Sequence, residues 1–167
     1  MASHQSIVKA PALRGRLIDR VAVITGASRG IGRAVALAFS REGALLTLVG
    51  RSREGVGRVA EEIAGSGARP LVLATDLTDA AAMEASRAAV LMRWGRLDVP
   101  VGNAAELGPL ASVAELPQAV WDSVIALNLT ANYRLIRTFD DLLRASDSGR
   151  AIFVTSAISR GKALRGA

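Results

Sequence analysis

Apolar residues recur along this chain as short, nearly uncharged runs, separated by longer segments that are apolar on one side only. Short runs of this kind are typical of parallel strands covered on both faces. They predict five strands, at residues 21–24, 44–49, 70–75, 97–102 and 151–155. Pro100 lies inside the fourth run and supplies no ladder donor, which weakens the prediction of a strand there.

The segments between these runs carry apolar residues at helical spacing. They predict helices at residues 33–42, 54–64 and 80–94, each followed by glycine, and two more at 118–127 and 128–144, which can also form one bent helix. Strands and helices that alternate in this way form right-handed βαβ units. We therefore expect an α/β fold with a parallel sheet and helices on both of its faces.

The composition narrows the class of protein. The chain has 167 residues, which suits one domain with a substantial core, here residues 18–167. Residues 1–17 are basic, lack an apolar signal-peptide core and are expected to be a flexible leader. No apolar run is long enough for a membrane helix, and the absence of cysteine excludes disulfides and thiolate chemistry. These features fit a cytoplasmic protein with no membrane partner.

The formal net charge of +6 raises nucleic acid as a partner. The 21 Lys and Arg are spread along the chain, however, and aromatic residues, on which bases stack, make up only 4%. We therefore expect no nucleic-acid partner. The sequence also contains no pattern that indicates a metal site.

The most informative stretch is TGASRGIG at residues 25–32, between the first predicted strand and the first helix. Gly26, Gly30 and Gly32 let the backbone turn tightly and approach a ligand without an intervening Cβ. The helix that opens near Ile31 presents unpaired N–H groups and the positive end of its dipole. A nucleotide diphosphate suits such a site. The alternative is a structural strand–helix turn with no ligand.

Polar residues follow the other predicted strands, namely Arg51, Asp76, Asn103 and the pair Thr155 and Ser156. Ligands of an open parallel sheet bind at the carboxyl ends of its strands. We therefore expect these residues to converge with the glycine loop on one site.

Two arginines bear on the choice of cofactor. A free ribose usually meets an acidic residue after the second strand, whereas a 2′-phosphate is recognised by arginine. Here Arg51 and Ser52 occupy that position, no carboxylate appears until Glu54, and Arg29 adds a cation within the glycine loop. We therefore expect NADP(H) rather than NAD(H). The alternative is that both arginines are solvated surface groups.

The loop at residues 25–32 closely resembles the cofactor loop of the short-chain dehydrogenase/reductase family. The resemblance covers most of residues 18–166. It implies a Rossmann-type, doubly wound α/β/α sandwich with strand order 3-2-1-4-5, whose later strands are missing here. It also implies an oxidoreductase that interconverts small-molecule carbonyls and alcohols by hydride transfer. The helix at 128–144 resembles one through which this family forms homodimers and homotetramers.

The resemblance also assigns residues to the cofactor. GNAA at 102–105 stands where the family usually has Asn-Asn-Ala-Gly beside the ribose, so that Asn103 and Ala104 match while the outer two residues depart. Asp76 and Leu77 match a pair that lines the adenine pocket, although from the residues alone Asp76 can be an acid at a helix N-terminus. The predicted cofactor site comprises Gly26, Ser28, Arg29, Gly30, Ile31, Gly32, Arg51, Ser52, Asp76, Leu77, Asn103, Ala104 and Ala105.

Two residues match the catalytic machinery of the family. Asn128 matches an asparagine that holds a water of the proton relay, and Ser156 matches the serine that hydrogen-bonds the substrate oxygen. From the residues alone, Asn128 is more often a helix cap.

The family's Tyr-x-x-x-Lys proton donor has no counterpart in this sequence. The only tyrosine, Tyr133, has Arg137 at the fourth place and is expected to pack at an interface or in the core. We therefore expect this chain to be inactive alone, either as an incomplete piece of a longer enzyme or as a truncated product. The alternative function is a nucleotide-binding module without turnover.

Overall fold

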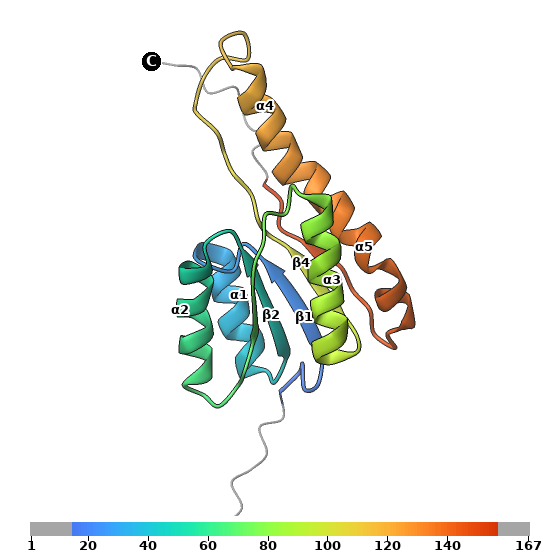
Figure 1. Cartoon of the computed structure of the whole chain (residues 1–167). Coiled ribbons are helices and arrows are strands. Elements are labelled where there is room, and N and C mark those ends of the chain that lie inside the picture. The colour runs from blue at the N-terminus through green and yellow to red at the C-terminus, as the bar shows by residue number, and fades with distance from the viewer. Residues whose placement is uncertain (1–14, 157–167) are drawn as a thin grey trace, which may run out of the picture.

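Figure 1 shows the chain as a computed structural model, which describes residues 15–156. Five strands form one parallel sheet in the order β3-β2-β1-β4-β5. They are β1 (Val21–Thr25), β2 (Leu45–Gly50), β3 (Leu71–Ala74), β4 (Val99–Gly102) and β5 (Ile152–Phe153). The predicted fold class and strand order are therefore confirmed, and the strand ends differ from the predicted ones by at most two residues.

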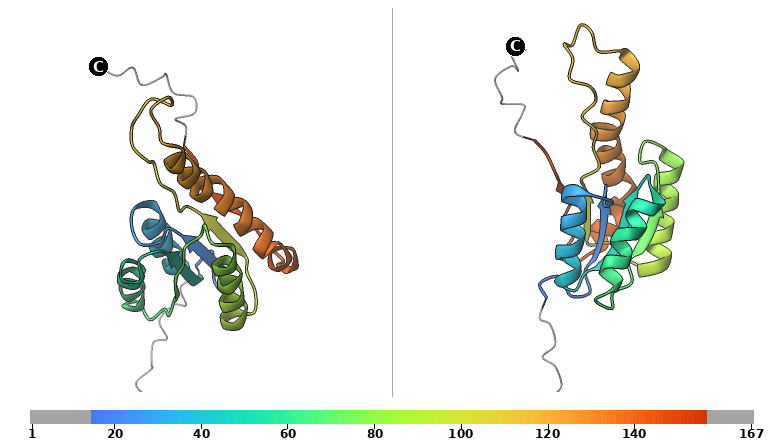
Figure 2. Two further views of the ribbon diagram at one scale, coloured as in Figure 1. Left: turned by 45° about the horizontal axis from the view of Figure 1, so that its top comes forward. Right: turned by 90° about the vertical axis from the view of Figure 1, so that its left-hand side faces the viewer.

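The sheet is the middle layer of three. The flanking helices are α1 (Gly30–Arg41) and α2 (Arg53–Ala64) on one face, and α3 (Ala80–Trp94) and α5 (Ala131–Ala145) on the other (Figure 2). β1 contributes to both cores because neighbouring side chains of a strand point to opposite faces. Ala22 and Ile24 pack with α1 and α2, whereas Val21 and Val23 pack with α3 and α5. Burial on both faces explains why this strand has no polar side.

β5 is shorter than its apolar run at 151–155 predicted, and Pro100 accounts for its late start. Asp98 O accepts from Arg150 N, and Gly102 O accepts from Val154 N, each at 2.9 Å. Alternate residues of 98–102 therefore direct their main-chain groups toward β5. Pro100 lies midway between them on the same side and has no N–H to donate. The paired strand therefore begins only at Ile152. On its other side, Pro100 stays in register with β1, so the predicted weakening is confined to one edge.

The two helices predicted at 118–127 and 128–144 form one continuous element. α4 (Gln118–Ile125) leads into a π-helical turn, η1 (Ala126–Thr130), which leads directly into α5. α4 has no buried residue and extends beyond the carboxyl ends of the strands (Figure 1). Within residues 15–156, no helix is both long enough and apolar enough to cross a bilayer.

Asp98 joins several elements at the opposite end of the sheet. Its buried carboxylate accepts hydrogen bonds from Val21 N at 2.8 Å, from the Ser146 hydroxyl and from the Arg96 guanidinium, and Arg20 lies 3.5 Å away. Burial opposes ionisation, but these donors outweigh it and hold the pKa of the Asp98 carboxyl below its usual value. One carboxylate therefore links the starts of β1 and β4 to the end of α5. No pattern in the sequence predicts this role of Asp98.

The described part of the predicted leader, residues 15–17, lies against the end of α1. Leu17 N donates to Glu42 O at 3.0 Å, and the Arg16 guanidinium forms an ion pair with the Glu42 carboxylate at 3.0 Å. The rest of the predicted leader and residues 157–167 lie outside the described residues.

Candidate functional site

The three glycines of the glycine loop, of which Gly30 and Gly32 already belong to the first turn of α1, have different roles. Gly26 and Gly30 adopt left-handed backbone conformations, with φ of +64° and +55°, which glycine enters without strain. A Cβ at Gly30 would meet no atom within 4 Å, because this residue borders an open cavity. A Cβ at Gly32 would lie 2.3 Å from the carbonyl oxygen of Gly26. Gly32 therefore allows α1 to pack against the loop and does not itself line the cavity.

The N-terminus of α1 lacks the groups that normally satisfy a helix start. Arg29, at the N-cap position, makes no side-chain cap, and the first turn contains no acidic residue. α2 and α3 differ, because the side chains of Ser52 and Asp79 accept hydrogen bonds from their first turns. The unpaired N–H groups of α1, together with its dipole, therefore favour an anion at this end.

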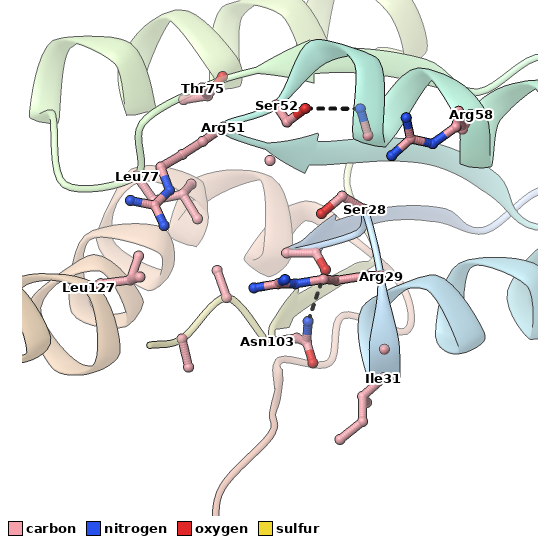
Figure 3. Close-up of a pocket in the computed structure, with 16 residues that line it drawn as sticks. Ser28, Arg29, Ile31, Arg51, Ser52, Arg58, Thr75, Leu77, Asn103 and Leu127 are labelled. Carbon is pink, nitrogen blue, oxygen red and sulfur yellow. Dashed lines mark hydrogen bonds between the residues drawn. The ribbon is translucent and has the colours of Figure 1, made fainter. Parts of the chain in front are cut away.

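This helix end opens into a cavity of about 540 Å³ at the carboxyl ends of the strands (Figure 3). The glycine loop, the segment from β2 into α2 and the loops after β3 and β4 form its wall. Every residue predicted to hold the cofactor lies in this wall except Gly32 and Asp76. The lining residues are Gly26, Ser28, Arg29, Gly30, Ile31, Gly50, Arg51, Ser52, Gly55, Arg58, Thr75, Leu77, Asn103, Ala104, Ala105 and Leu127.

The charged side chains that line the cavity are all arginines among the described residues. Arg29 extends from the glycine loop and Arg51 from the end of β2, with Arg58 on the neighbouring helix α2 (Figure 3). In the part of the chain that the structure describes, no acidic residue lines the cavity. Within residues 15–156, neither Arg29 nor Arg51 forms an ion pair, and no group of three His, Cys, Asp or Glu could hold a metal ion. The cavity therefore suits an anion with several negative charges better than a cation.

Thr25 fastens the loop after β4 to the start of the glycine loop. Its buried hydroxyl donates to Val101 O at 3.0 Å and accepts from Asn103 N at 2.8 Å and Ala104 N at 3.1 Å. The Asn103 amide donates in turn to Thr25 O at 2.9 Å and to Gly26 O at 3.3 Å. Asn103 thus borders the cavity while its side chain holds the glycine loop in place.

Asp76 follows β3 but does not border the cavity. Its Oδ1 accepts from the N–H of Thr78 at 2.9 Å and from the hydroxyl of Thr78 at 2.8 Å. These two bonds, aided by the charge of Arg51, outweigh burial and hold the pKa of the Asp76 carboxyl below its usual value. The residues on either side, Thr75 and Leu77, line the cavity instead. Asp76 therefore closes the turn that leads to α3.

Asn128 lies in η1 and is not a helix cap. Its Oδ1 accepts from Glu106 N at 2.9 Å, and its Nδ2 donates to Glu106 O at 2.8 Å. The side chain of Asn132 donates to the main-chain oxygen of Asn128 at 2.8 Å. Asn128 thus binds the loop after β4 to the π-helical turn.

Tyr133, one turn further on, is 57% exposed, so it does not pack in the core. Its alternative place at an interface stays a prediction.

Ser156 is the last described residue and is exposed. It follows β5 at the carboxyl end of the sheet, where Val154 N donates to Gly102 O at 2.9 Å. It does not line the cavity, and residues 157–167, which come next, lie outside the described residues.

Sequence reasoning missed several residues of the site, among them Thr25, Thr75, Leu127, Gly55 and Arg58. Thr25 directly follows one predicted strand and Thr75 ends another, so their position was a usable signal. Arg58 lies inside a predicted helix, where arginine is ordinary, whereas Gly55 is unfavourable inside a helix and was a weak signal of a close contact. Their place at the cavity depends on the contact between α2 and the glycine loop, which only the folded chain shows.

The amino-acid sequence of this chain is similar to those of known proteins. Residues 20–166 match the profile of a family described as short chain dehydrogenase. The chain is 34% identical over 155 residues to the uncharacterized oxidoreductase YciK of Escherichia coli (strain K12), covering 90% of this chain and 62% of that one. It is 35% identical over 153 residues to sorbitol dehydrogenase of Cereibacter sphaeroides, covering 90% of this chain and 58% of that one.

A solved structure gives a similar result. The crystal structure of a metagenomic short-chain oxidoreductase in complex with NADP superposes with a TM-score of 0.80 at 38% identity, covering 84% of this chain and 63% of that one. The chain thus spans about three fifths of the length of these three proteins.

Proposed function

The chain belongs to the short-chain dehydrogenase family, and from this premise we propose that it binds NADP(H) in the arginine-lined cavity. The relatives are named as oxidoreductases and dehydrogenases. We propose the same class of reaction here, in which hydride passes between the nicotinamide and the carbon of a small carbonyl compound or alcohol.

The observation that carries this proposal is the uncapped N-terminus of α1, which opens past Gly30 into a cavity with cationic walls. The N–H groups of residues 28–32 would hold the pyrophosphate, because they are unpaired donors at the positive end of a helix. Arg51 and Arg29 would hold the 2′-phosphate, for which a forked guanidinium is suited. The solved relative in complex with NADP supports this choice.

The remaining lining residues fit the other parts of the cofactor. Leu77 and Leu127 offer apolar surface for the adenine, with Thr75 beside them. Asn103 and Ala104, fixed by Thr25, would border the ribose. When bound, the nicotinamide supplies or accepts the hydride, and the protein orients it.

Two residues would serve the substrate and the proton. Ser156, at the carboxyl end of the sheet, would donate a hydrogen bond to the substrate oxygen. Asn128 uses one donor and one acceptor of its amide on Glu106, so one N–H and one lone pair remain with which it could hold a water of the proton relay.

We also propose that the protein forms a homodimer or homotetramer through η1 and α5. Leu129, Tyr133 and Ile136 are spaced at helical intervals and are 63%, 57% and 41% exposed. Apolar side chains in such a row are costly to leave in water, and a second copy would cover them.

Titration with nucleotides tests the binding proposal. The chain, at constant concentration and ionic strength, is titrated with NADPH and with NADH, and binding is followed by calorimetry. We expect both to bind and NADPH to bind at least tenfold more tightly, since one bidentate phosphate contact is worth about 1.5–3 kcal/mol. Absence of heat with both nucleotides at millimolar concentration would refute the proposal. NADPH oxidation in the presence of carbonyl substrates then separates an enzyme from a module that binds without turnover.

A further inference from the structure

We infer that Glu54 and Arg58 set the preference of this site for NADP(H) over NAD(H). Arg58 forms an ion pair with Glu54 when the site is empty and binds the 2′-phosphate when NADP(H) is bound. This inference rests on the proposed function and assigns a role to two residues that the proposed function does not use. Arg58 would be a third cation that binds the 2′-phosphate, and the Glu54 carboxylate would compete with that phosphate for Arg58.

The packing of α2 brings Arg58 to the cavity. A Cβ at Gly55 would lie only 3.1 Å from the Cβ of Ser28, so the first turn of α2 lies directly against the glycine loop. Ser52 fixes this turn by accepting from Gly55 N at 3.0 Å. Arg58 lies three residues after Gly55 and therefore on the same side of the helix. This places its side chain in the cavity wall together with Ser28 and Arg29.

The present partner of Arg58 is Glu54, four residues earlier on the same helix face. The two side chains are 66% and 82% exposed, and an exposed pair of this kind is held weakly. A phosphate dianion offers more charge and several acceptor oxygens, so Arg58 gains by exchanging one carboxylate for it. Neither Arg29 nor Arg51 forms an ion pair among the described residues, and Arg51 only feels the charge of the nearby Asp76, so Arg58 is the one paired, and therefore adjustable, cation of the three.

Glu54 has a second effect because it lies in the first turn of α2, next to the segment that carries Arg51 and Ser52. Its charge is neutralised while Arg58 is paired with it. When Arg58 moves to the phosphate, the carboxylate is left uncompensated near a group of the same sign. Glu54 therefore opposes a 2′-phosphate in two ways and leaves a cofactor with a free ribose unaffected.

Four single variants test this inference: Arg58→Gln, Glu54→Gln and two matched controls from the same helix. Arg53→Gln removes an exposed cation that does not line the cavity, and Glu61→Gln removes an exposed carboxylate further along α2. Each variant is titrated with NADPH, NADH and adenosine 2′,5′-bisphosphate. Retained NADH affinity shows that the fold and the glycine loop are intact.

We expect Arg58→Gln to weaken NADPH and adenosine 2′,5′-bisphosphate about tenfold, as the loss of one charge-assisted hydrogen bond implies. Glu54→Gln should tighten both about threefold, and NADH should change less than twofold in either variant. The two controls should change no ligand by more than twofold.

Two outcomes overturn the inference alone. In one, Arg58→Gln weakens NADPH no more than Arg53→Gln does. In the other, it weakens NADPH and NADH equally. A wild-type chain that binds neither nucleotide overturns the proposed function and this inference with it.

Discussion

Replacing Thr25 with valine removes a single hydroxyl from the point where β1 meets the loop after β4. The two side chains have nearly the same shape, and Thr25 is only 2% exposed, so valine fits the space. The hydroxyl makes three hydrogen bonds, one as donor to Val101 O and two as acceptor from the N–H groups of Asn103 and Ala104. Valine can replace none of them.

The cost of this change follows from those three bonds. Each is worth about 1 kcal/mol net, and donors left without a partner away from water cost somewhat more, so we expect Thr25→Val to lower the free energy of unfolding by about 3 kcal/mol. With a denaturant slope of about 2 kcal/mol per molar urea, the midpoint should fall by about 1.5 M while the slope stays unchanged. NADPH affinity should fall as well, because Asn103 and Ala104 lose their anchor beside the cavity.

Thr25→Ser provides the control, since it keeps the hydroxyl and loses only a methyl group, worth about 1 kcal/mol. Urea unfolding of the three proteins, followed by circular dichroism, measures the difference. If Thr25→Val is as stable as Thr25→Ser, the hydroxyl does not hold the loop and the reasoning is refuted.

Three further predictions concern the glycine loop, the buried carboxylate and the exposed helix face. Gly30→Ala should cost about 1 kcal/mol of backbone strain and Gly32→Ala about 2–3 kcal/mol, because only the second places a Cβ against a carbonyl oxygen; equal urea midpoints would contradict this. Because the folded-state pKa of Asp98 lies below its unfolded value of about 3.9, its stabilisation is present above that value and is lost as the pH falls through the folded pKa. The urea midpoint should therefore drop between pH 5 and pH 2, and Asp98→Asn, though less stable at pH 7, should show a smaller drop. Ile136→Asp should reduce the mass seen by light scattering to that of a monomer, whereas Leu91→Asp, on α3 and 39% exposed, should not.

The fold could be predicted from the sequence because the strands are buried on both faces. The run at residues 21–24 has no polar position, and the structure shows the reason, since its side chains alternate between two separate cores. The glycine loop was equally visible, because only glycine adopts the backbone conformation at Gly26 and Gly30 without strain. Both signals are local, so they need no knowledge of the tertiary structure.

Features that depend on contacts between distant segments could not be predicted. Gly30 and Gly32 are the same residue type, yet Gly32 packs against the carbonyl oxygen of Gly26 while Gly30 borders the cavity. From the sequence Asn128 resembles a helix cap. In the structure its side-chain amide bonds both the N–H and the carbonyl oxygen of Glu106, 22 residues away in the chain. The late start of β5 likewise requires knowing which side of Pro100 faces it. In each case the missing information is the identity of a partner that lies elsewhere in the sequence.

The π-helical turn at Ala126–Thr130 changes the direction in which the side chains of α4 point around the helix axis, relative to those of α5. A π turn takes in one residue more than an α turn, and each residue of an α-helix advances the side chains by about 100° around the axis. The projecting helix α4 is therefore rotated by about that angle relative to an uninterrupted helix of the same sequence. Deleting one residue of η1 would keep the helix but turn Trp121 and its neighbours to another direction and carry Asn128 away from Glu106. The direction in which the projecting tip faces is thus set by one surplus residue, independently of how α5 is packed on the sheet.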